Sequence, residues 1–393
     1  MAMLEIKPGV FWVGGIDWDL RNFHGYSTRR GTTYNAYLII DQKIVLVDTV
    51  KHYMFDEMLG RIREIVDPSR IDYIVSNHVE MDHSGSLERM QALAPNATIL
   101  TSTMGEKGLL RHFRGLRLRV VKSGETLDIG KRTLQFHHIP MVHWPDSMVT
   151  YIPQDGLLLS NDAFGQHIGS EERFDDLLDW GILREEAAKY YANIVMPYGD
   201  QVKAALGALS GLRIDMIAPS HGIIWRSRIP DILKQYMKWC TYETEKKALI
   251  VYDSMWHSTE RMAHALREGL ENAGIAVAMR NLSVTDMSDV VTDMQDSRLV
   301  LLGSPTINNG MLPTMGAFLT YIKGLRPRRR IGFSFGSYGW GGQAMGEIEG
   351  AIKAMGWELP EKGVSLKFIP GEDEMAALRA TGQRLGEIVR NSN

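Results

Sequence analysis

The sequence predicts an α/β protein with two domains, on three observations. The chain has 393 residues, more than one ordinary hydrophobic core holds. Short apolar runs rich in β-branched residues alternate with segments of helical periodicity. From about residue 248 this alternation becomes regular, which is typical of a doubly wound parallel sheet of about five strands with helices on both faces.

The first part of the chain indicates a mixed sheet. Strands are expected at 10–13, 34–40 and 44–47, because these runs are apolar and are separated by turn residues. A helical period covers about 54–66. The apolar run 71–75 then predicts a buried strand that leads directly into a cluster of polar residues.

The same pattern continues to residue 240, with strands expected at 157–159 and 214–218, each ending at polar residues. The charged segment 242–247 precedes a new apolar strand. We therefore place the domain boundary there and predict domains at 1–246 and 247–393. In the second domain the expected elements are strands at 248–251, 276–280, 299–302 and 331–335, a helix at 258–272 and a last helix after 370.

The composition is that of a soluble globular protein, with 44% hydrophobic and 23% charged residues. The net charge of −3 argues against a nucleic-acid-binding protein. Cys240 is the only cysteine, which excludes an intramolecular disulfide and an iron–sulfur cluster and indicates a reducing, cytoplasmic setting. We expect neither a signal peptide nor a membrane span, since no run approaches about 20 apolar residues.

A dense group of metal-capable residues follows the strand at 71–75. His78, Glu80 and Asp82 alternate along the chain, so an extended backbone points them to one side, and a turn brings His83 back. Mixed nitrogen and oxygen donors suit metals of intermediate softness. The segment therefore predicts a metal site.

Three single residues follow other expected strands: His143, Asp162 and His221. Each alone is a weak signal, because a histidine at a strand end is more often simply hydrogen-bonded. Together with the first cluster they make four histidines and three carboxylates. That set is enough for two metal ions with one bridging carboxylate.

The pattern His-x-Glu-x-Asp-His with distant His, Asp and His resembles the metallo-β-lactamase superfamily, and Glu80 in place of the usual histidine resembles its flavodiiron branch. The strings at 32–38, 143–148, 161–167 and 218–226 also resemble flavodiiron proteins. The resemblance implies a metallo-β-lactamase-like αβ/βα sandwich followed by a flavodoxin-like domain. It also implies that His78, Glu80 and His143 hold one iron, that Asp82, His83 and His221 hold the other, and that Asp162 bridges them.

Three loops at strand ends of the second domain resemble FMN-binding loops. The loops 303–310 and 337–342 resemble the FMN-ring loops of flavodoxins, whereas the loop 254–259 carries Trp256 and His257 where flavodoxins often have glycine and resembles the flavodiiron version. The loop 254–259 lies between a strand and a helix, where phosphate binds in this fold, although a Ser/Thr-rich helix cap is the alternative. No Gly-x-Gly-x-x-Gly follows a strand, so FMN is expected rather than direct NAD binding. The predicted FMN residues are Ser254, Met255, Trp256, His257, Ser258, Thr259, Pro305, Thr306, Ile307, Asn308, Asn309, Ser337, Tyr338, Gly339, Trp340, Gly341 and Gly342.

His24, His167 and Tyr191 lie in or near segments that resemble the surroundings of the family's di-iron pocket. The histidines are candidates to supply a proton or to shape the pocket, and Tyr191, together with Tyr190, to line it. Ordinary packed or surface residues are the alternative.

The resemblance implies an oxidoreductase that takes electrons from an external donor, commonly rubredoxin, and reduces dioxygen, nitric oxide or both. It further implies a head-to-tail homodimer or a dimer of dimers. Because the sequence contains no Cys-x-x-Cys, we expect no fused rubredoxin module and a separate donor. Two other functions stay open: a binuclear metallohydrolase with an accessory flavodoxin domain, and an electron carrier whose first domain docks partners. The preference between the two gases is not predicted.

Overall fold

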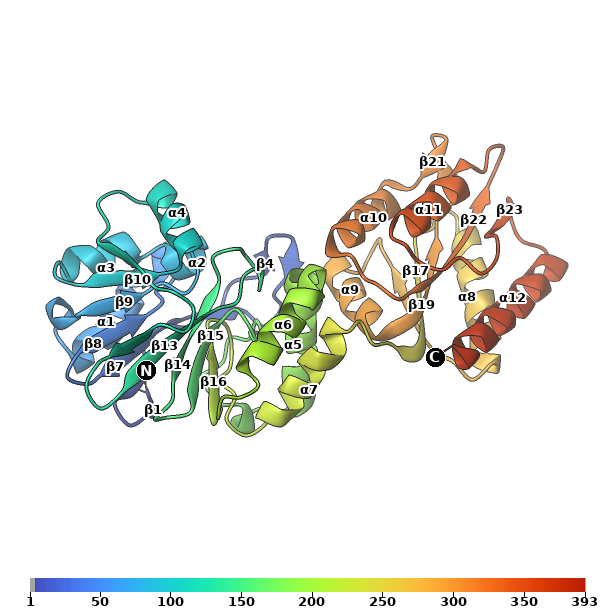
Figure 1. Ribbon diagram of the computed structural model, residues 1–393. Helices are drawn as coiled ribbons and strands as arrows, with labels where there is room; N and C mark the ends of the chain where they lie inside the picture. The colour runs from blue at the N-terminus through green and yellow to red at the C-terminus, as the bar shows by residue number, and fades with distance from the viewer. Residues whose placement is uncertain (1–3, 393) are drawn as a thin grey trace. The chain divides into compact units, whose positions relative to one another are not determined.

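The computed structural model describes residues 4–392, which form two compact units (Figure 1). The first unit holds most of the described chain up to Cys240. The second begins at Thr241, where the sequence predicts 247, and also includes Gly25–Ser27 and Ala192–Pro197. Among residues 4–392, none of the helices has the length and apolar composition that crossing a bilayer requires.

Two large sheets form the framework of the first unit. The first sheet has seven strands in the order β1 (Leu4–Lys7), β2 (Val10–Trp12), β7 (Tyr37–Ile40), β8 (Ile44–Val47), β9 (Tyr73–Val75), β10 (Thr98–Thr101) and β11 (Leu118–Val120). The second has five, in the order β12 (Thr126–Asp128), β13 (Thr133–His138), β14 (Met148–Ile152), β15 (Leu157–Asn161) and β16 (Met216–Pro219). From β8 onward the first sheet is parallel, and β15 and β16 form the parallel pair of the second.

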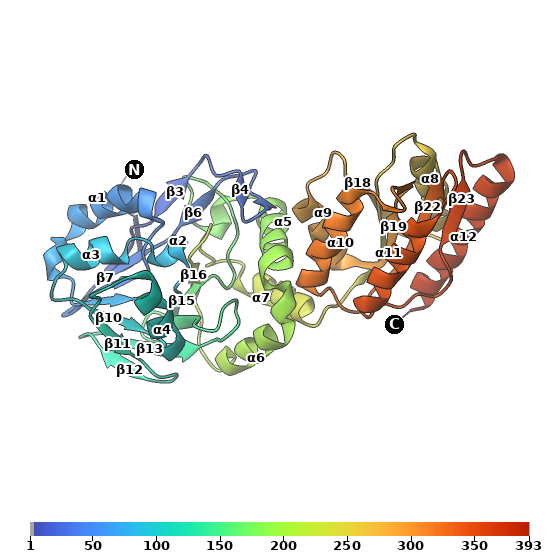
Figure 2. The same ribbon diagram turned by 90° about the horizontal axis from the view of Figure 1, so that it is seen from above.

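Seven α-helices lie outside these sheets: α1 (Phe55–Ile65), α2 (Met81–Ser84), α3 (Leu87–Leu93), α4 (Thr103–His112), α5 (Trp180–Tyr190), α6 (Gly199–Leu209) and α7 (Ile229–Cys240). Short 3₁₀ segments lie at His52–Met54, Pro68–Arg70, Asp175–Leu177 and Met196–Tyr198, with a π-turn at Tyr191–Val195. Figure 2 shows α1 and α3 beside the first sheet, and both figures show α6 and α7 beside β15 and β16.

Packing joins these layers into the predicted αβ/βα sandwich. Val47 of β8 and Leu159 of β15 belong to one buried cluster between the two sheets. On the other face of the first sheet, Leu46 packs in a cluster with Met58 and Ile62, which share one side of α1 at helical spacing. The predicted fold of the first domain is confirmed.

One predicted strand is interrupted. The run 34–40 divides into β6 (Thr32–Tyr34), which pairs with β3 (Gly15–Asp17), and β7. The break falls at Asn35, whose side-chain amide donates to the carbonyls of Pro219 and Gly222 at 2.8 and 3.1 Å. Because Pro219 ends β16 and Gly222 lies in the loop after it, the break ties the two sheets together beside His221. Two further short strands are β4 (Asn22–Phe23) and β5 (Tyr26–Ser27).

The second unit contains a five-stranded parallel sheet in the order β18 (Ala276–Asn281), β17 (Glu245–Tyr252), β19 (Ser297–Gly303), β22 (Ile331–Tyr338) and β23 (Val364–Lys367). Its helices are α8 (Ser258–Asn272), α9 (Met287–Asp296), α10 (Pro313–Leu325), α11 (Gln343–Ala354) and α12 (Glu372–Asn391), with a small hairpin of β20 (Thr306–Ile307) and β21 (Gly310–Met311). This is the predicted doubly wound, flavodoxin-like sheet, and its order reverses between β17 and β19. The sequence did not locate β23, a short edge strand.

Candidate metal centre and flavin site

The seven predicted metal ligands lie together at one edge of the two sheets. They form two groups: His78, Glu80, His143 and Asp162, and Asp82, His83 and His221. Within each group, the candidate ligand atoms lie within 4.8 Å of one another. The ligands follow β9, β15 and β16 or lie in the loop before β14, and these chain ends meet at the same edge because β14 runs antiparallel to β15.

Asp162 lies between the two groups. Its Oδ2 is 3.5 Å from Nε2 of His143, and its Oδ1 is 3.1 Å from Nε2 of His83. The same two oxygens face His78 at 3.6 Å and His221 at 3.5 Å, respectively. Each oxygen of the Asp162 carboxylate therefore faces the histidines of one ligand group, which is the arrangement that a bridging ligand needs.

Several atoms that are predicted to bind metal are buried without a well-aligned hydrogen bond. Among residues 4–392, neither ring nitrogen of His83 and neither carboxylate oxygen of Asp82 makes a hydrogen bond of good geometry. Their close neighbours are other charged groups of the cluster, Asp162 at 3.1 Å from His83 and His221 at 3.2 Å from Asp82. Burying polar atoms in this state is unfavourable unless another group satisfies them. Metal ions would do so, and the mixture of imidazole and carboxylate donors fits iron.

Hydrogen bonds on the far side of two rings fix their orientation. Nδ1 of His78 lies 2.9 Å from Oδ2 of Asp146, and Nδ1 of His221 lies 2.7 Å from the carbonyl oxygen of Thr33. Both contacts leave Nε2 directed into the cluster. Such outer partners hold a metal-binding histidine in the correct tautomer and position.

The charges of the cluster perturb one another strongly in the absence of metal. Burial lowers the pKa of His78, but hydrogen bonds to Asp146 and Glu80 outweigh burial and raise it to about 10. The pKa of His83 is also about 10: burial opposes the charge, and Asp82 and Asp162 favour it. Burial raises the pKa of Asp162, whereas the surrounding histidines bring it well below its ordinary value. The buried carboxylates therefore stabilise positive charge at the site.

A buried polar network supports the loops that carry the ligands. Asp48, which follows β8, accepts hydrogen bonds from the backbone and side-chain N–H groups of Asn77 at 2.8 and 3.0 Å. It also accepts from the amide of Asn161 at 3.3 Å. Since Asn77 precedes His78 and Asn161 precedes Asp162, one carboxylate positions both ligand loops.

The three other predicted pocket residues occupy different environments. His24 is largely exposed, and its Nε2 lies 3.3 Å from Oε1 of Glu80. His167 is buried, with Nδ1 2.7 Å from Oγ1 of Thr32, and burial, reinforced by His221, holds its pKa well below the ordinary value. The ring of Tyr191 packs against Tyr236 and Trp239, with ring centroids 5.2 Å apart in each case.

Two further residues contact the predicted ligands: Tyr190, which the sequence offered only together with Tyr191 as a pocket-lining pair, and Asp146, which it did not name singly. The hydroxyl of Tyr190 donates to Oδ1 of Asp162 at 3.0 Å, so the structure brings Tyr190 rather than its neighbour Tyr191 into contact with a ligand. Asp146 orients His78 and also accepts from the backbone N–H of Val79 at 2.8 Å. Its position in the string 143–148 was a usable signal, whereas nothing in the Tyr-Tyr pair indicates which ring faces the site.

The second unit has a cavity of about 710 Å³ at the carboxyl ends of its strands, where the three predicted FMN loops converge. The predicted residues that line it are Met255, Trp256, Ser258, Pro305, Thr306, Ile307, Asn308, Asn309, Ser337, Tyr338, Gly339, Trp340 and Gly341. Phe368 and Ile369, in the loop after β23, also line it and were missed because that strand was not located. Ser254, His257, Thr259 and Gly342 are outside this lining set.

The loop before α8 has the chemistry to hold a phosphate. The hydroxyl oxygen of Ser254 is buried and has no hydrogen-bond partner among residues 4–392. Ser258 begins α8, and Oγ1 of Thr259 lies 3.0 Å from Oγ of Ser337. Free hydroxyl and backbone N–H groups at a helix N-terminus bind phosphate, so the loop fits the phosphate of FMN.

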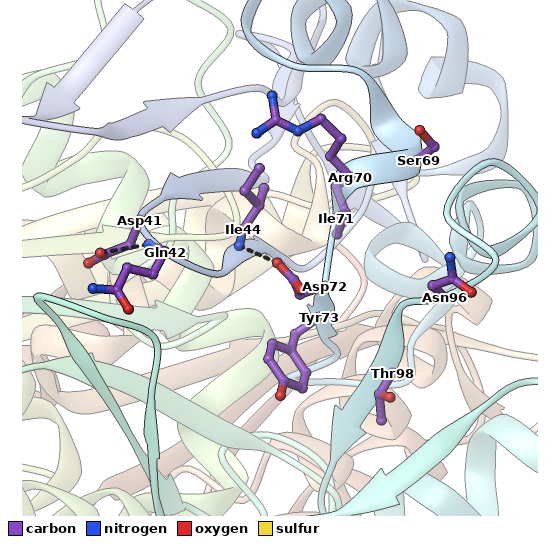
Figure 3. Close-up of a pocket in the computed structure, with 10 residues that line it drawn as sticks. All are labelled: Asp41, Gln42, Ile44, Ser69, Arg70, Ile71, Asp72, Tyr73, Asn96 and Thr98. Atoms are coloured by element: carbon purple, nitrogen blue, oxygen red, sulfur yellow. Dashed lines mark hydrogen bonds between the residues drawn. The ribbon is translucent and has the colours of Figure 1, made fainter.

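A polar depression of about 490 Å³ lies at the other edge of the first sheet, where β8, β9 and β10 begin (Figure 3). Its acidic groups are already satisfied: Asp72 accepts from Nζ of Lys43 at 3.0 Å and from the backbone N–H of Ile44 at 2.9 Å. We assign no chemistry to it.

Comparison with known proteins agrees with the fold of both domains. Residues 32–222 match the model of the ODP family of β-lactamases, and residues 250–382 match the flavodoxin model. A nitric oxide reductase of Moorella thermoacetica is 45% identical over 97% of this chain and 98% of its own. The solved rubredoxin oxygen:oxidoreductase of Desulfovibrio gigas superposes with a TM-score of 0.97 at 39% identity, covering 99% of both chains. The flavodiiron protein of Giardia intestinalis also gives 0.97, at 34% identity over 99% of this chain and 97% of that one.

Proposed function

Because this chain belongs to the flavodiiron protein family, we propose that it reduces dioxygen, nitric oxide or both, with electrons from an external donor relayed through FMN to a non-haem di-iron centre. The observation that carries the proposal is the position of Asp162 between two complete ligand groups, in a chain whose second domain has a flavin-sized cavity.

In this proposal His78, Glu80 and His143 hold one iron, Asp82, His83 and His221 hold the other, and Asp162 bridges them. The unsatisfied donor atoms of Asp82 and His83 support metal binding. Glu80 supports iron over zinc, because it replaces a neutral imidazole with a hard anionic oxygen. The iron centre supplies redox chemistry at the gas, and FMN supplies one- and two-electron transfer.

The chain's own residues orient the ligands and move protons. Asp146 and the carbonyl of Thr33 hold His78 and His221 with Nε2 directed inward. His24 is exposed to solvent and lies beside Glu80, so its Nε2 is placed to exchange a proton between solvent and the centre. His167 stays neutral because it is buried, and it shapes the pocket wall beside His221.

For FMN, the loop of Ser254 and Ser258 would take the phosphate, and the loops around Thr306 and Tyr338 would enclose the ring. Trp256 and Trp340 border the cavity with 87% and 92% of their surface exposed. Large exposed aromatic surfaces of this kind mark interaction sites. They support a head-to-tail homodimer, or a dimer of such dimers, in which a second copy covers the flavin. A monomer that turns over at full rate would contradict this part of the proposal.

The donor is part of the proposal as well: a rubredoxin or a similar small electron carrier, as the name of the D. gigas relative indicates for that protein. A cytoplasmic location completes it, supported by a single, buried cysteine, Cys240. A metallohydrolase is not favoured, because Glu80 favours iron over zinc and a flavin cavity has no role in hydrolysis. A simple electron carrier is not favoured either, because all seven ligand positions are filled.

The test measures consumption of each gas by protein loaded with iron and FMN and supplied with reduced rubredoxin. Faster uptake of nitric oxide than of dioxygen marks a nitric oxide reductase, and the reverse marks an oxygen reductase. If neither gas is consumed while both cofactors are bound, the proposed function is wrong, and assays for thioester or lactam hydrolysis then test the metallohydrolase.

A further inference from the structure

A small apolar cavity lies in the first unit between the second sheet and helices α6 and α7. Its volume is about 20 Å³, and Val142, Val149, Leu158, Val202 and Leu206 contribute to its wall. All of these side chains are buried except Leu206, which is half-buried. The cavity is separate from the flavin site and from the polar depression of Figure 3.

The polar groups in the wall of this cavity are already hydrogen-bonded. The hydroxyl of Ser160 donates to the carbonyl of Ala163 at 2.7 Å, and the hydroxyl of Tyr236 accepts from the backbone N–H of Phe164 at 2.7 Å. A water molecule needs two or more polar partners to be held in a buried site, and apolar cavities stay dry. This cavity therefore favours an apolar occupant over water.

The cavity adjoins the two loops that carry two of the proposed metal ligands. Val142 immediately precedes His143 in the chain, and Ala163 and Phe164 immediately follow Asp162. On the opposite side, Ala205 and Leu206 of α6 are half-buried, whereas Val202 and Leu209 of the same helix are buried. The cavity thus extends from a partly exposed stretch of α6 to the two loops that carry His143 and Asp162.

We infer that this cavity binds small apolar gas molecules and holds one substrate molecule on its way from α6 to the metal centre. Its volume exceeds the roughly 10–15 Å³ that one water-sized molecule requires, so it accepts a diatomic gas. Dioxygen and nitric oxide are apolar enough to leave water for such a space. The role as a substrate path rests on the proposed function, whereas gas binding does not.

Gas binding is tested first, without reference to activity. Crystals of the protein loaded with iron and FMN are pressurised with krypton, and anomalous density is sought beside Val149 and Leu206. A krypton peak there is the expected result. The Val202→Ala variant, which enlarges the cavity, should give higher occupancy. Absence of a peak in both proteins would overturn the inference.

The role as a path is tested with a matched pair of substitutions on α6. Ala205→Phe places a ring in the cavity mouth, whereas Ala204→Phe adds the same ring at an exposed neighbouring position. For Ala205→Phe we expect loss of the krypton peak and a fall of about tenfold in kcat/KM for the gas, with kcat at saturating gas unchanged. Ala204→Phe should match the unsubstituted protein.

Equal kcat/KM values for Ala205→Phe and Ala204→Phe would show that the cavity is not a substrate path. The krypton result alone would then decide whether the cavity binds gas. If the loaded protein consumes neither gas, the proposed function fails, and a krypton peak would still establish the cavity as a gas site. The two failures are therefore distinguishable.

Discussion

The hydroxyl of Tyr190 donates a 3.0 Å hydrogen bond to Oδ1 of Asp162, the same oxygen that faces His83 and His221. Both residues are buried. In this geometry Tyr190 occupies one lone pair of the proposed bridging carboxylate and limits how Asp162 can rotate. The relationship sets a role for Tyr190 that is separate from that of its neighbour Tyr191.

We expect Tyr190→Phe to weaken iron binding by about tenfold, because loss of an outer hydrogen bond to a metal ligand typically has an effect of this size. Iron retention against a chelator measures the change. Tyr191→Phe is the matched control, since it removes a hydroxyl from the adjacent ring without touching Asp162. A larger loss for Tyr191→Phe than for Tyr190→Phe would contradict the assignment.

Replacing Asp146 should affect one metal position more than the other. Asp146→Asn keeps the size of the side chain but removes the carboxylate that accepts from His78 and Val79. We expect iron content to fall toward one ion per chain, because His78 belongs to only one of the two ligand groups. Iron analysis after dialysis checks this. Asp176→Asn, at an exposed surface position, should retain both ions. Equal loss of iron from the two variants would count against the role of Asp146.

Iron uptake should strengthen as the pH rises. A metal binds only unprotonated imidazole, and in the metal-free protein the pKa of His78 is raised to about 10 by Asp146 and Glu80 against the effect of burial. Protons therefore compete with iron over the whole range from about pH 6 to about pH 9. Anaerobic titration with ferrous iron measures the affinity together with the protons released. An affinity that does not depend on pH would contradict this expectation.

The free energy of unfolding of the metal-free protein should fall as the pH rises, whereas the affinity for iron should increase. A raised histidine pKa means that folding favours the protonated ring. The contribution of His78 to the free energy of unfolding is then fully present below the pKa of the unfolded state, about 6.5. It is lost as the pH rises through the folded-state pKa of about 10. Urea unfolding of the metal-free and iron-loaded proteins at several pH values separates this effect from that of the metal.

Ser254→Ala tests the phosphate end of the flavin site. The buried Ser254 hydroxyl has no partner among the described residues, so a bound phosphate is the group that satisfies it. We expect FMN to bind about tenfold more weakly, the effect of losing one charge-assisted hydrogen bond. Riboflavin, which lacks the phosphate, should bind unchanged. Ser283→Ala, at an exposed position of the same domain, is the control, and equal weakening for FMN and riboflavin would mean that Ser254 does not contact the phosphate.

The sheet architecture and most element positions followed from the sequence, because alternation of apolar and polar residues reports local geometry directly. The predicted helix 258–272 corresponds to α8, and the predicted strand 44–47 to β8. The break between β6 and β7 was not predictable, because it depends on hydrogen bonds from Asn35 to carbonyls more than 180 positions later in the chain. The edge strand β23 was missed because it is short and only partly buried, which weakens its apolar signal.

The sequence by itself determined the two domains, the seven candidate ligands and the three flavin loops. Four of those ligands fall within six residues, but the expected extended backbone was wrong beyond Glu80. Helix α2 begins at Met81 and directs Asp82 and His83 to the second ligand group, apart from His78 and Glu80. Only the tertiary structure decided that each oxygen of Asp162 faces a different group, that Tyr190 rather than Tyr191 contacts it, and that an apolar cavity adjoins both ligand loops. These relationships join segments distant in the chain, so they depend on how sheets and helices pack in three dimensions, which no local pattern encodes.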